Sequence, residues 1–259
     1  MHKFLIAVVA MVTMAFNCRA DNCREIQLSN DGAKLFVYLP SHPNGMAVMA
    51  CPGGGYSHLA MNHEGKDLAP WFNARGITYA VLQYRMPEAG GEPRPMIDAI
   101  EGLDVLTDSA TVWGLDPDRI GIMGASAGGH LAAYTANTDP RVKFQILFYP
   151  VISMRDGVTH KGSQTNLLGK EATDDDKAKY SVEELVTSST PPAFIMLSSD
   201  DKTVIPENSA RYLSRMFEAG VRGNEMHVYP KGGHGWGFRD SFIYKPQWTA
   251  ALSDWLKLR

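Results

Sequence analysis

Residues 121–130 read GIMGASAGGH, and this short stretch decides how the rest of the chain is interpreted. It starts as an apolar, strand-like run and passes through the pattern G-A-S-A-G, centred on Ser126, into a helix-compatible segment. A strand, a tight turn and a helix in that order form a nucleophile elbow, which exposes its serine oxygen at the start of the helix. Glycine at Gly124 and Gly128 fits such a turn, because larger side chains would collide across it. The alternative is an incidental small-residue turn, and partner residues must decide between the two.

Partner residues are needed because a serine hydroxyl is a weak nucleophile near neutral pH. An imidazole must take its proton, and an acid must orient that imidazole. Three histidines follow the elbow helix. His160 lies in a long irregular segment, and His227 alternates with apolar residues in a strand-like run. His234 lies in the glycine-rich loop KGGHGWG, residues 231–237, directly after the last predicted strand, so we predict His234 as the base.

The acid is expected where the apolar run 193–197 ends and leads into SSDDKTVIP. A carboxylate at the carboxyl end of a strand is well placed to reach a loop at the same edge of the sheet. Asp200 and Asp201 are the two candidates. Asp201 precedes Val204 by three residues, the spacing of loops that usually carry this acid, so we favour Asp201. Asp200 is expected to face solvent or to bond the turn.

Backbone N–H groups are the usual donors to the negative charge that develops on an attacked carbonyl oxygen. The motif PGGGY, residues 52–56, follows the strand-like run 46–51, and its glycines let the backbone approach a substrate closely. We predict an oxyanion hole made by Gly53, Gly54 and Ala127. A phosphate-binding loop is disfavoured because no Gly-Lys-Ser/Thr follows the glycines.

The composition indicates one globular domain, since 259 residues with 44% hydrophobic and 20% charged residues suffice for a large core. A net charge of -3 without a sustained basic run lacks the pattern of a nucleic-acid binder. Strand-like and helix-like segments alternate, which favours an α/β fold with a mostly parallel, twisted sheet of about eight strands and helices on both faces. Strands are predicted at residues 25–28, 33–38, 46–51, 77–84, 120–123, 144–149, 193–197 and 225–229, and helices at 62–74, 95–113, 127–136, 206–219 and 241–258.

Two stretches interrupt this alternation. Residues 152–192 form a longer segment than an ordinary connection, which predicts a cap-like insertion near the site with a short helix at 177–185. Within it, the acidic run 174–176 is interpreted as a helix start rather than as a metal site. The glycine- and proline-rich stretch 86–94 is predicted as a surface loop.

Residues 1–20 have the positive start, short apolar middle and small-residue end of a secretory signal peptide. The apolar run is too short to cross a bilayer, so no stable membrane span is expected. We therefore predict a secreted or periplasmic protein whose catalytic domain covers residues 21–259, and lipid attachment at Cys18 is the less favoured alternative. After cleavage, Cys23 and Cys51 either form a disulfide or leave Cys51 as a buried thiol.

Four motifs together resemble the α/β-hydrolase superfamily: PGGGYSH, GASAGGHLAAY, DDKTVIPENS and GGHGWGF, which begin at residues 52, 124, 200 and 232. Within it they are similar to secreted carbohydrate esterases described as acetyl xylan esterases or bifunctional feruloyl and acetyl xylan esterases. The resemblance covers residues 30–258 and implies Ser126 as nucleophile, Asp201 as acid and His234 as base. Many relatives carry histidine where this chain has Pro52.

The reaction that the resemblance implies is release of acetyl, or secondarily feruloyl, groups from an acylated oligo- or polysaccharide such as xylan. This chemistry needs no cofactor and no metal. Three alternatives stay open: a serine peptidase of the prolyl oligopeptidase type, a glycosidase and a non-catalytic carbohydrate-binding protein. From the 259 residues we expect no propeller domain of the kind such peptidases usually add, and no carboxylate pair of the kind a glycosidase requires stands out.

Aromatic and histidine side chains beside the motifs have open interpretations. Tyr56 and Trp236 are predicted either to stack on sugar or to pack inside the fold. His58 and His63 flank the glycine loop and are candidate substrate contacts, whereas His130 is expected to pack within the elbow helix. These histidines have no recognisable zinc-ligand spacing.

Overall fold

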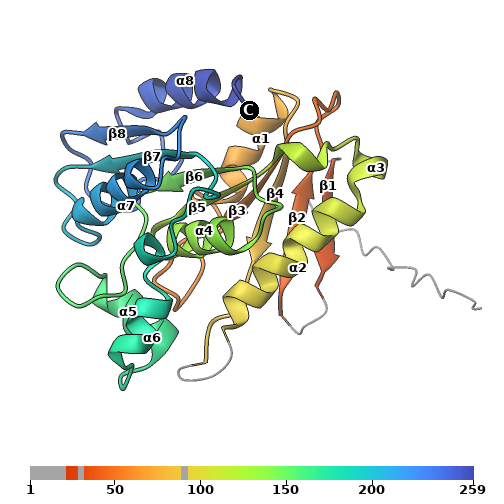
Figure 1. Ribbon diagram of the computed structural model, residues 1–259. Coiled ribbons are helices and arrows are strands. Elements are labelled where there is room, and N and C mark those ends of the chain that lie inside the picture. The colour runs from red at the N-terminus through yellow and green to blue at the C-terminus, as the bar shows by residue number, and fades with distance from the viewer. Residues whose placement is uncertain (1–21, 29–31, 89–92) are drawn as a thin grey trace, which may run out of the picture.

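A central eight-stranded sheet with helices on both faces makes up the computed structural model, which describes residues 22–28, 32–88 and 93–259 (Figure 1). The strands lie in the order β1-β2-β4-β3-β5-β6-β7-β8. Their bounds are β1 (Cys23–Gln27), β2 (Lys34–Tyr38), β3 (Ala47–Cys51), β4 (Thr78–Gln83), β5 (Ile120–Ala125), β6 (Phe144–Phe148), β7 (Ala193–Ser198) and β8 (Glu225–Tyr229). All eight predicted strands are confirmed, with bounds shifted by at most two residues.

The pairing of the strands brings the loops of the predicted site together at the carboxyl ends of the parallel strands. β2 runs antiparallel to β1 and β4, and the strands from β4 across β3 to β8 are parallel. After β3 the chain forms β4 on one side and returns to β5 on the other. Loops that follow β3 and β5 therefore diverge at their carboxyl ends, where open α/β sheets form their ligand crevice.

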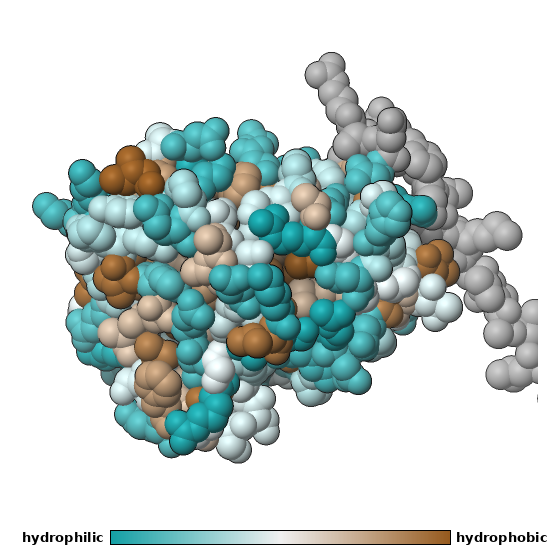
Figure 2. Space-filling view, turned by 90° about the horizontal axis from the view of Figure 1, so that it is seen from above, coloured by the Kyte–Doolittle hydropathy of each residue, from teal (hydrophilic) through white to brown (hydrophobic). Residues whose placement is uncertain are grey.

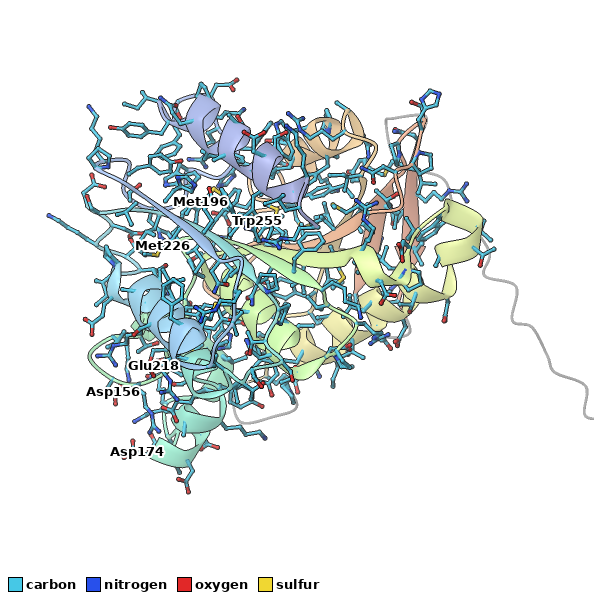
Figure 3. All side chains as sticks on the ribbon, turned by 45° about the horizontal axis from the view of Figure 1, so that its top comes forward. Asp156, Asp174, Met196, Glu218, Met226 and Trp255 are labelled. Carbon is cyan, nitrogen blue, oxygen red and sulfur yellow. The ribbon has the colours of Figure 1, made fainter. Side chains whose placement is uncertain are left out.

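Helices cover both faces of the sheet. α1 and α8 lie on one face, and α2, α4 and α7 lie on the other (Figure 1). On the α8 side, the indole of Trp255, labelled in Figure 3, packs against Phe194 of β7 with ring centroids 5.6 Å apart. The bounds are α1 (Ala69–Asn73), α2 (Arg94–Asp108), α3 (Ala110–Trp113), α4 (Ser126–Thr138), α5 (Lys161–Leu168), α6 (Asp174–Lys179), α7 (Glu207–Glu218) and α8 (Lys245–Leu256).

Outside the insertion, two of the predicted helices are not continuous in the structure. The helix predicted at 62–74 consists of turns, a 3₁₀ turn at Lys66–Leu68 and the short α1. The break lies at Gly65, whose φ of −142° and ψ of −97° are non-helical, and a Cβ there would lie 2.6 Å from the Met61 carbonyl oxygen, so the position requires glycine. The helix predicted at 95–113 divides into α2 and α3 at Ser109, whose ψ of 1° departs from α-helical geometry.

The insertion, residues 152–192, lies between β6 and β7 and contains α5, α6 and a 3₁₀ turn at Val182–Glu184. The acidic run begins α6 as predicted, and Thr173 and Asp176 close a capping box there. The helix predicted at 177–185 is wrong, because α6 ends at Lys179 and the chain then tightens into the 3₁₀ turn. In Figure 3, Asp156 and Asp174 lie at the outer end of the insertion.

Several expectations concern the ends and surface of the chain. The proposed signal peptide, Cys18 and part of the predicted 86–94 loop lie outside the described residues. Cys51 is a free, fully buried thiol, so it forms no disulfide with Cys23, and burial raises its pKa. Among the residues the structure describes, no helix has the length and apolar character to cross a membrane. On the face shown in Figure 2, hydrophobic residues lie in small separate patches between hydrophilic ones.

Candidate active site

Ser126 lies in a strained turn between β5 and α4. Its φ is +54°, a left-handed conformation that a residue with a side chain adopts rarely. A Cβ at Gly124 would lie 2.0 Å from the Gly128 carbonyl oxygen, and one at Gly128 would lie 2.0 Å from the Cys51 carbonyl oxygen. Both glycines are therefore required by the turn itself, which is the geometry of a nucleophile elbow.

His234 lies beside Ser126, on the loop that follows β8. Its Nε2 is 2.8 Å from the Ser126 hydroxyl oxygen, and its Nδ1 is 2.6 Å from Oδ2 of Asp201. An ionised carboxylate only accepts hydrogen bonds, so Nδ1 carries the proton and Nε2 is left to accept the serine hydroxyl proton. The structure brings together the three side chains that the sequence pattern selected, although 108 residues separate Ser126 from His234.

The two adjacent aspartates have different environments. Asp201 is 3% exposed, and its Oδ1 accepts the backbone N–H groups of Thr203 and Val204 at 2.9 and 3.0 Å. These bonds hold the carboxylate so that Oδ2 meets the imidazole. Asp200 is exposed and accepts the Gly233 N–H at 2.8 Å, which lowers its pKa. Asp200 thus binds the backbone of the histidine loop, not the imidazole.

The glycine loop after β3 lies against the nucleophile turn. A Cβ at Gly53 would lie 3.0 Å from that of Ser126. The Gly53 N–H donates to Oε2 of Glu64 at 2.9 Å, so the prediction that it donates to an oxyanion conflicts with the structure. Within the described residues, the N–H groups of Gly54 and Ala127 make no hydrogen bond, which leaves these two as the candidate donors.

Neither aromatic residue proposed for sugar stacking presents a free ring face. Tyr56 is 2% exposed, and its hydroxyl bonds Nδ1 of His130 at 2.8 Å. Trp236 is 4% exposed, stacks on Phe242 with centroids 4.0 Å apart and donates its indole N–H to Ser198. Both residues therefore pack inside the fold.

The other histidines beside the motifs differ in burial and in bonding. His130 is fully buried in α4, as predicted, and burial lowers its pKa to about 4. Its Nε2 donates to the Tyr180 carbonyl oxygen at 2.7 Å, which joins α4 to the insertion. His63 lies 3.9 Å from Glu64, and burial lowers its pKa. Among the described residues, the His58 imidazole hydrogen-bonds only the hydroxyl of its neighbour Ser57.

His160 is closer to the site than its sequence context indicated. Its Nδ1 accepts the Ser163 N–H and caps the start of α5, so the neutral ring carries its proton on Nε2. A Cβ at Gly55 would lie 3.8 Å from the imidazole, which places His160 over the glycine loop. Burial, and then the charge of His234, lower its pKa. The insertion thus contributes a histidine to the rim of the site.

Glu64 and Tyr149 are the residues at the site that the sequence pattern missed. Glu64 is 3% exposed, and the Tyr149 hydroxyl donates to its Oε1 at 2.7 Å. Tyr149 follows β6 with a positive φ of +36°, and its ring lies 4.6 Å from that of His234. A positive φ at a non-glycine residue after a strand has no signature in the sequence, whereas the acidic residue in the run after PGGGY was a visible signal.

The arrangement can perform acyl transfer. It combines a serine in a nucleophile elbow, a base whose tautomer is fixed, a buried orienting carboxylate and two N–H groups that make no hydrogen bond next to the nucleophile. A cavity of about 440 Å³ lies directly beside His234 and is also lined by Trp236 and Arg239.

Two family models match the chain. The model described as the prolyl oligopeptidase family matches residues 93–258, which include the elbow, the acid and the histidine. The model described as BD-FAE matches residues 35–150, which include the glycine loop and the elbow. Together the two matches extend from β2 to α8.

Similar proteins include an acetylxylan esterase from Xylanibacter ruminicola, which is 41% identical over 98% of this chain. An endo-1,4-beta-xylanase B from Butyrivibrio fibrisolvens is 31% identical over 78% of the chain. The chain spans 54% and 34% of the lengths of these two relatives. The crystal structure of an acetyl ester-xyloside bifunctional hydrolase from Caldicellulosiruptor lactoaceticus superposes with a TM-score of 0.82 at 30% identity, covering 97% of this chain and 98% of that one.

Proposed function

Because the chain belongs to the prolyl oligopeptidase family and has the α/β-hydrolase fold, we propose that it is a serine esterase that removes acetyl groups from plant polysaccharides such as xylan. The observation that carries the proposal is the hydrogen-bonded series from Asp201 through His234 to Ser126, at 2.6 and 2.8 Å. The acetyl group is the preferred acyl group because the similar acetylxylan esterase and the acetyl ester-xyloside hydrolase both act on acetyl esters by name.

In the first step, the Ser126 oxygen attacks the acyl carbon while its proton passes to Nε2 of His234. The carbonyl π electrons move onto the carbonyl oxygen, and the N–H groups of Gly54 and Ala127 donate to this oxyanion. Asp201 accepts the Nδ1 proton in a hydrogen bond and stabilises the imidazolium. Collapse of the intermediate then breaks the bond to the sugar oxygen, which takes the proton from His234.

In the second step, water replaces the sugar. The water oxygen attacks the acetyl-Ser126 carbonyl carbon while His234 takes a proton from the water. The serine oxygen then leaves and takes that proton from His234. Acetate is released and the enzyme returns to its starting state. The sugar must lie within reach of His234 Nε2 during the first step, and His234 lines a cavity of about 440 Å³ together with Trp236 and Arg239.

A matched assay tests this function. Acetate release from acetylated xylan and ferulate release from methyl ferulate are measured with wild type, Ser126→Ala and the control Ser214→Ala, which alters an exposed serine on α7. We expect acetate release by wild type and by the control, and a fall of at least about 10⁴-fold in Ser126→Ala. Undiminished acetate release by Ser126→Ala contradicts the proposal. Ferulate release decides whether feruloyl esters are also substrates.

Secretion is part of the proposal, since polysaccharides lie outside the cell. The support is the composition of residues 1–20, with a lysine followed by a short apolar run. Expression of the full chain, followed by N-terminal sequencing of the exported protein, is expected to find the chain starting at residue 21. A cytoplasmic protein that starts at Met1 contradicts it.

Peptidase activity is a second candidate, favoured by the match to the prolyl oligopeptidase family. The same triad chemistry cleaves amides, so substrate binding decides between the two. Cleavage of a proline-containing peptide p-nitroanilide at a higher kcat/KM than p-nitrophenyl acetate identifies a peptidase. A p-nitrophenyl xyloside in the same series tests the xyloside hydrolysis named for the structural relative.

A further inference from the structure

A buried carboxylate next to the triad has no part in the proton transfers described above. Glu64 lies in the turns between β3 and α1, and both of its oxygens accept hydrogen bonds. Among the described residues its only ion pair is with His63, at 3.9 Å. Removing a carboxylate from water is costly unless hydrogen bonds compensate, so these particular partners are the reason such a group can be held there.

The first partner is the loop that carries the oxyanion donor. Oε2 of Glu64 accepts the Gly53 N–H at 2.9 Å. A Cβ at Gly53 would lie 2.6 Å from this same oxygen and 2.6 Å from the Ala125 carbonyl oxygen. The Gly53 backbone is therefore wedged between the carboxylate and the nucleophile turn. The bond to Glu64 therefore holds the Pro52–Gly53 peptide in place, and the next peptide along the chain bears the Gly54 N–H.

The second partner connects Glu64 to the histidine loop. The Tyr149 hydroxyl donates to Oε1 of Glu64 and accepts the Gly237 N–H at 2.8 Å. Gly237 is three residues beyond His234, and the Tyr149 ring lies 4.6 Å from the imidazole. Gly237 is also close to Glu64, because a Cβ there would lie 3.1 Å from Glu64 Cγ. One carboxylate thus connects the loop after β3 with the loop after β8.

We propose that Glu64 is a positioning residue for the esterase reaction: its carboxylate holds the Pro52–Gly53 peptide, which precedes the peptide bearing the Gly54 N–H, and, through Tyr149, it holds the backbone beside His234. It does not touch the substrate. Its contribution appears in the transition state, because both the oxyanion donor and the base must be in place only when the acyl carbon becomes tetrahedral. The proposal rests on the proposed function, since it assumes that Ser126 is the nucleophile.

The test compares Glu64→Gln and Tyr149→Phe with the control Asp139→Asn. Glutamine keeps the shape of Glu64, but its single oxygen can accept from only one of the two partners. Phenylalanine keeps the ring and removes the hydroxyl that joins Glu64 to Gly237. Asp139 is also a buried, ion-paired carboxylate, but it lies at the end of α4 opposite Ser126. Its loss is expected to lower the Tm and to leave kcat unchanged.

Four quantities separate positioning from stability: kcat and KM for p-nitrophenyl acetate, Ki for an alkylboronic acid that forms a tetrahedral adduct, and the rate of labelling by paraoxon. In Glu64→Gln we expect kcat and the labelling rate to fall about 10- to 100-fold and Ki to rise by a similar factor, with KM changed less than threefold. In Tyr149→Phe we expect changes of about five- to tenfold in the same direction.

The proposal is overturned if folded Glu64→Gln or, where that variant does not fold, Tyr149→Phe keeps kcat, Ki and labelling rate within threefold of wild type. It is also overturned if Asp139→Asn loses as much activity as Glu64→Gln. Failure of the proposed function has a different signature: wild type that is labelled by paraoxon but hydrolyses no acetyl ester. In that case the paraoxon labelling rates of wild type and Glu64→Gln still test whether Glu64 positions the site. A wild type that paraoxon does not label overturns both.

Discussion

The loops at the carboxyl edge of the sheet and the insertion at residues 152–192 meet over the same site, but different interactions hold them in place. The loops are fixed by buried bonds, such as Gly53 to Glu64 and Asp201 to His234. The outer end of the insertion is held by exposed ion pairs, of which Arg155–Glu184 and Lys177–Asp156 are examples. Exposed ion pairs contribute little stability, whereas buried hydrogen bonds that lose one partner are costly.

This difference suggests that the loops carry out the reaction and that the insertion affects substrate binding. Side chains that move protons need positions fixed within a fraction of an ångström, and the buried bonds provide that. The insertion contributes the rim through His160, and Asn166 donates to the Gly55 carbonyl oxygen at 2.8 Å. Changes in the loops should therefore reduce kcat by large factors, and changes in the insertion should alter KM by small ones.

The largest contrast is between the two adjacent aspartates. Asp201→Asn removes the charge behind His234 and favours the wrong imidazole tautomer, so we expect kcat to fall about 10³- to 10⁴-fold. Asp200→Asn keeps an oxygen that can accept the Gly233 N–H, and we expect less than a fivefold change. Steady-state kinetics with p-nitrophenyl acetate measure both. Similar losses in the two variants would contradict the assignment of Asp201.

The hydrogen bonds of His130, which connect the glycine loop and the insertion, are expected to weaken in acid. His130 bonds Tyr56 and the Tyr180 carbonyl oxygen in its neutral form, and its pKa of about 4 lies below the ordinary 6.5. The unfolded chain therefore binds a proton between pH 6.5 and 4 that the folded chain does not. The contribution of neutral His130 to the free energy of unfolding is fully present above pH 6.5. It is lost as the pH falls toward 4, by on the order of 3 kcal/mol.

Urea unfolding of wild type and His130→Gln at several pH values between 7 and 4.5 measures this contribution. The variant has no imidazole at this position, so we expect its free energy of unfolding to depend less steeply on pH in this window. Parallel pH dependences in the two proteins would mean that His130 is not the group that titrates.

The smallest expected effect is at the rim. His160→Ala removes a neutral imidazole whose Nε2–H has no hydrogen bond within the described part of the chain. We expect KM for acetylated xylo-oligosaccharides to rise about three- to tenfold, the cost of one hydrogen bond, with kcat for p-nitrophenyl acetate nearly unchanged. His42→Ala, at an exposed position outside the insertion, is the control. A large fall in kcat would place His160 in the chemistry instead.

The sequence predicted the loops better than the insertion, for physical reasons. Apolar runs buried on both faces of a parallel sheet mark the strands clearly, and the α/β-hydrolase fold is confirmed. The elbow, too, is a local pattern of glycines around Ser126. α5 escaped prediction because His160 caps it, where serine, threonine, aspartate or asparagine is usual.

Contacts between distant segments were beyond reach. The bonds of Tyr149 to Glu64 and Gly237 join residues 85 and 88 positions apart, and no local pattern encodes them. The same applies to Gly53. The sequence predicts that its N–H donates to the oxyanion, whereas in the structure it donates to the carboxylate of Glu64, eleven residues away. Burial of Tyr56 and Trp236 likewise depends on tertiary packing, since each residue type suits a sugar surface and a core equally.

The most direct test of the central claim is the site and rate of paraoxon labelling, measured by intact mass and peptide mapping. We expect one phosphoryl adduct per chain, located on Ser126, with labelling slowed at least about 10³-fold in His234→Ala because the hydroxyl loses its base. An adduct on another residue, or labelling of Ser126 at an undiminished rate without His234, would contradict it.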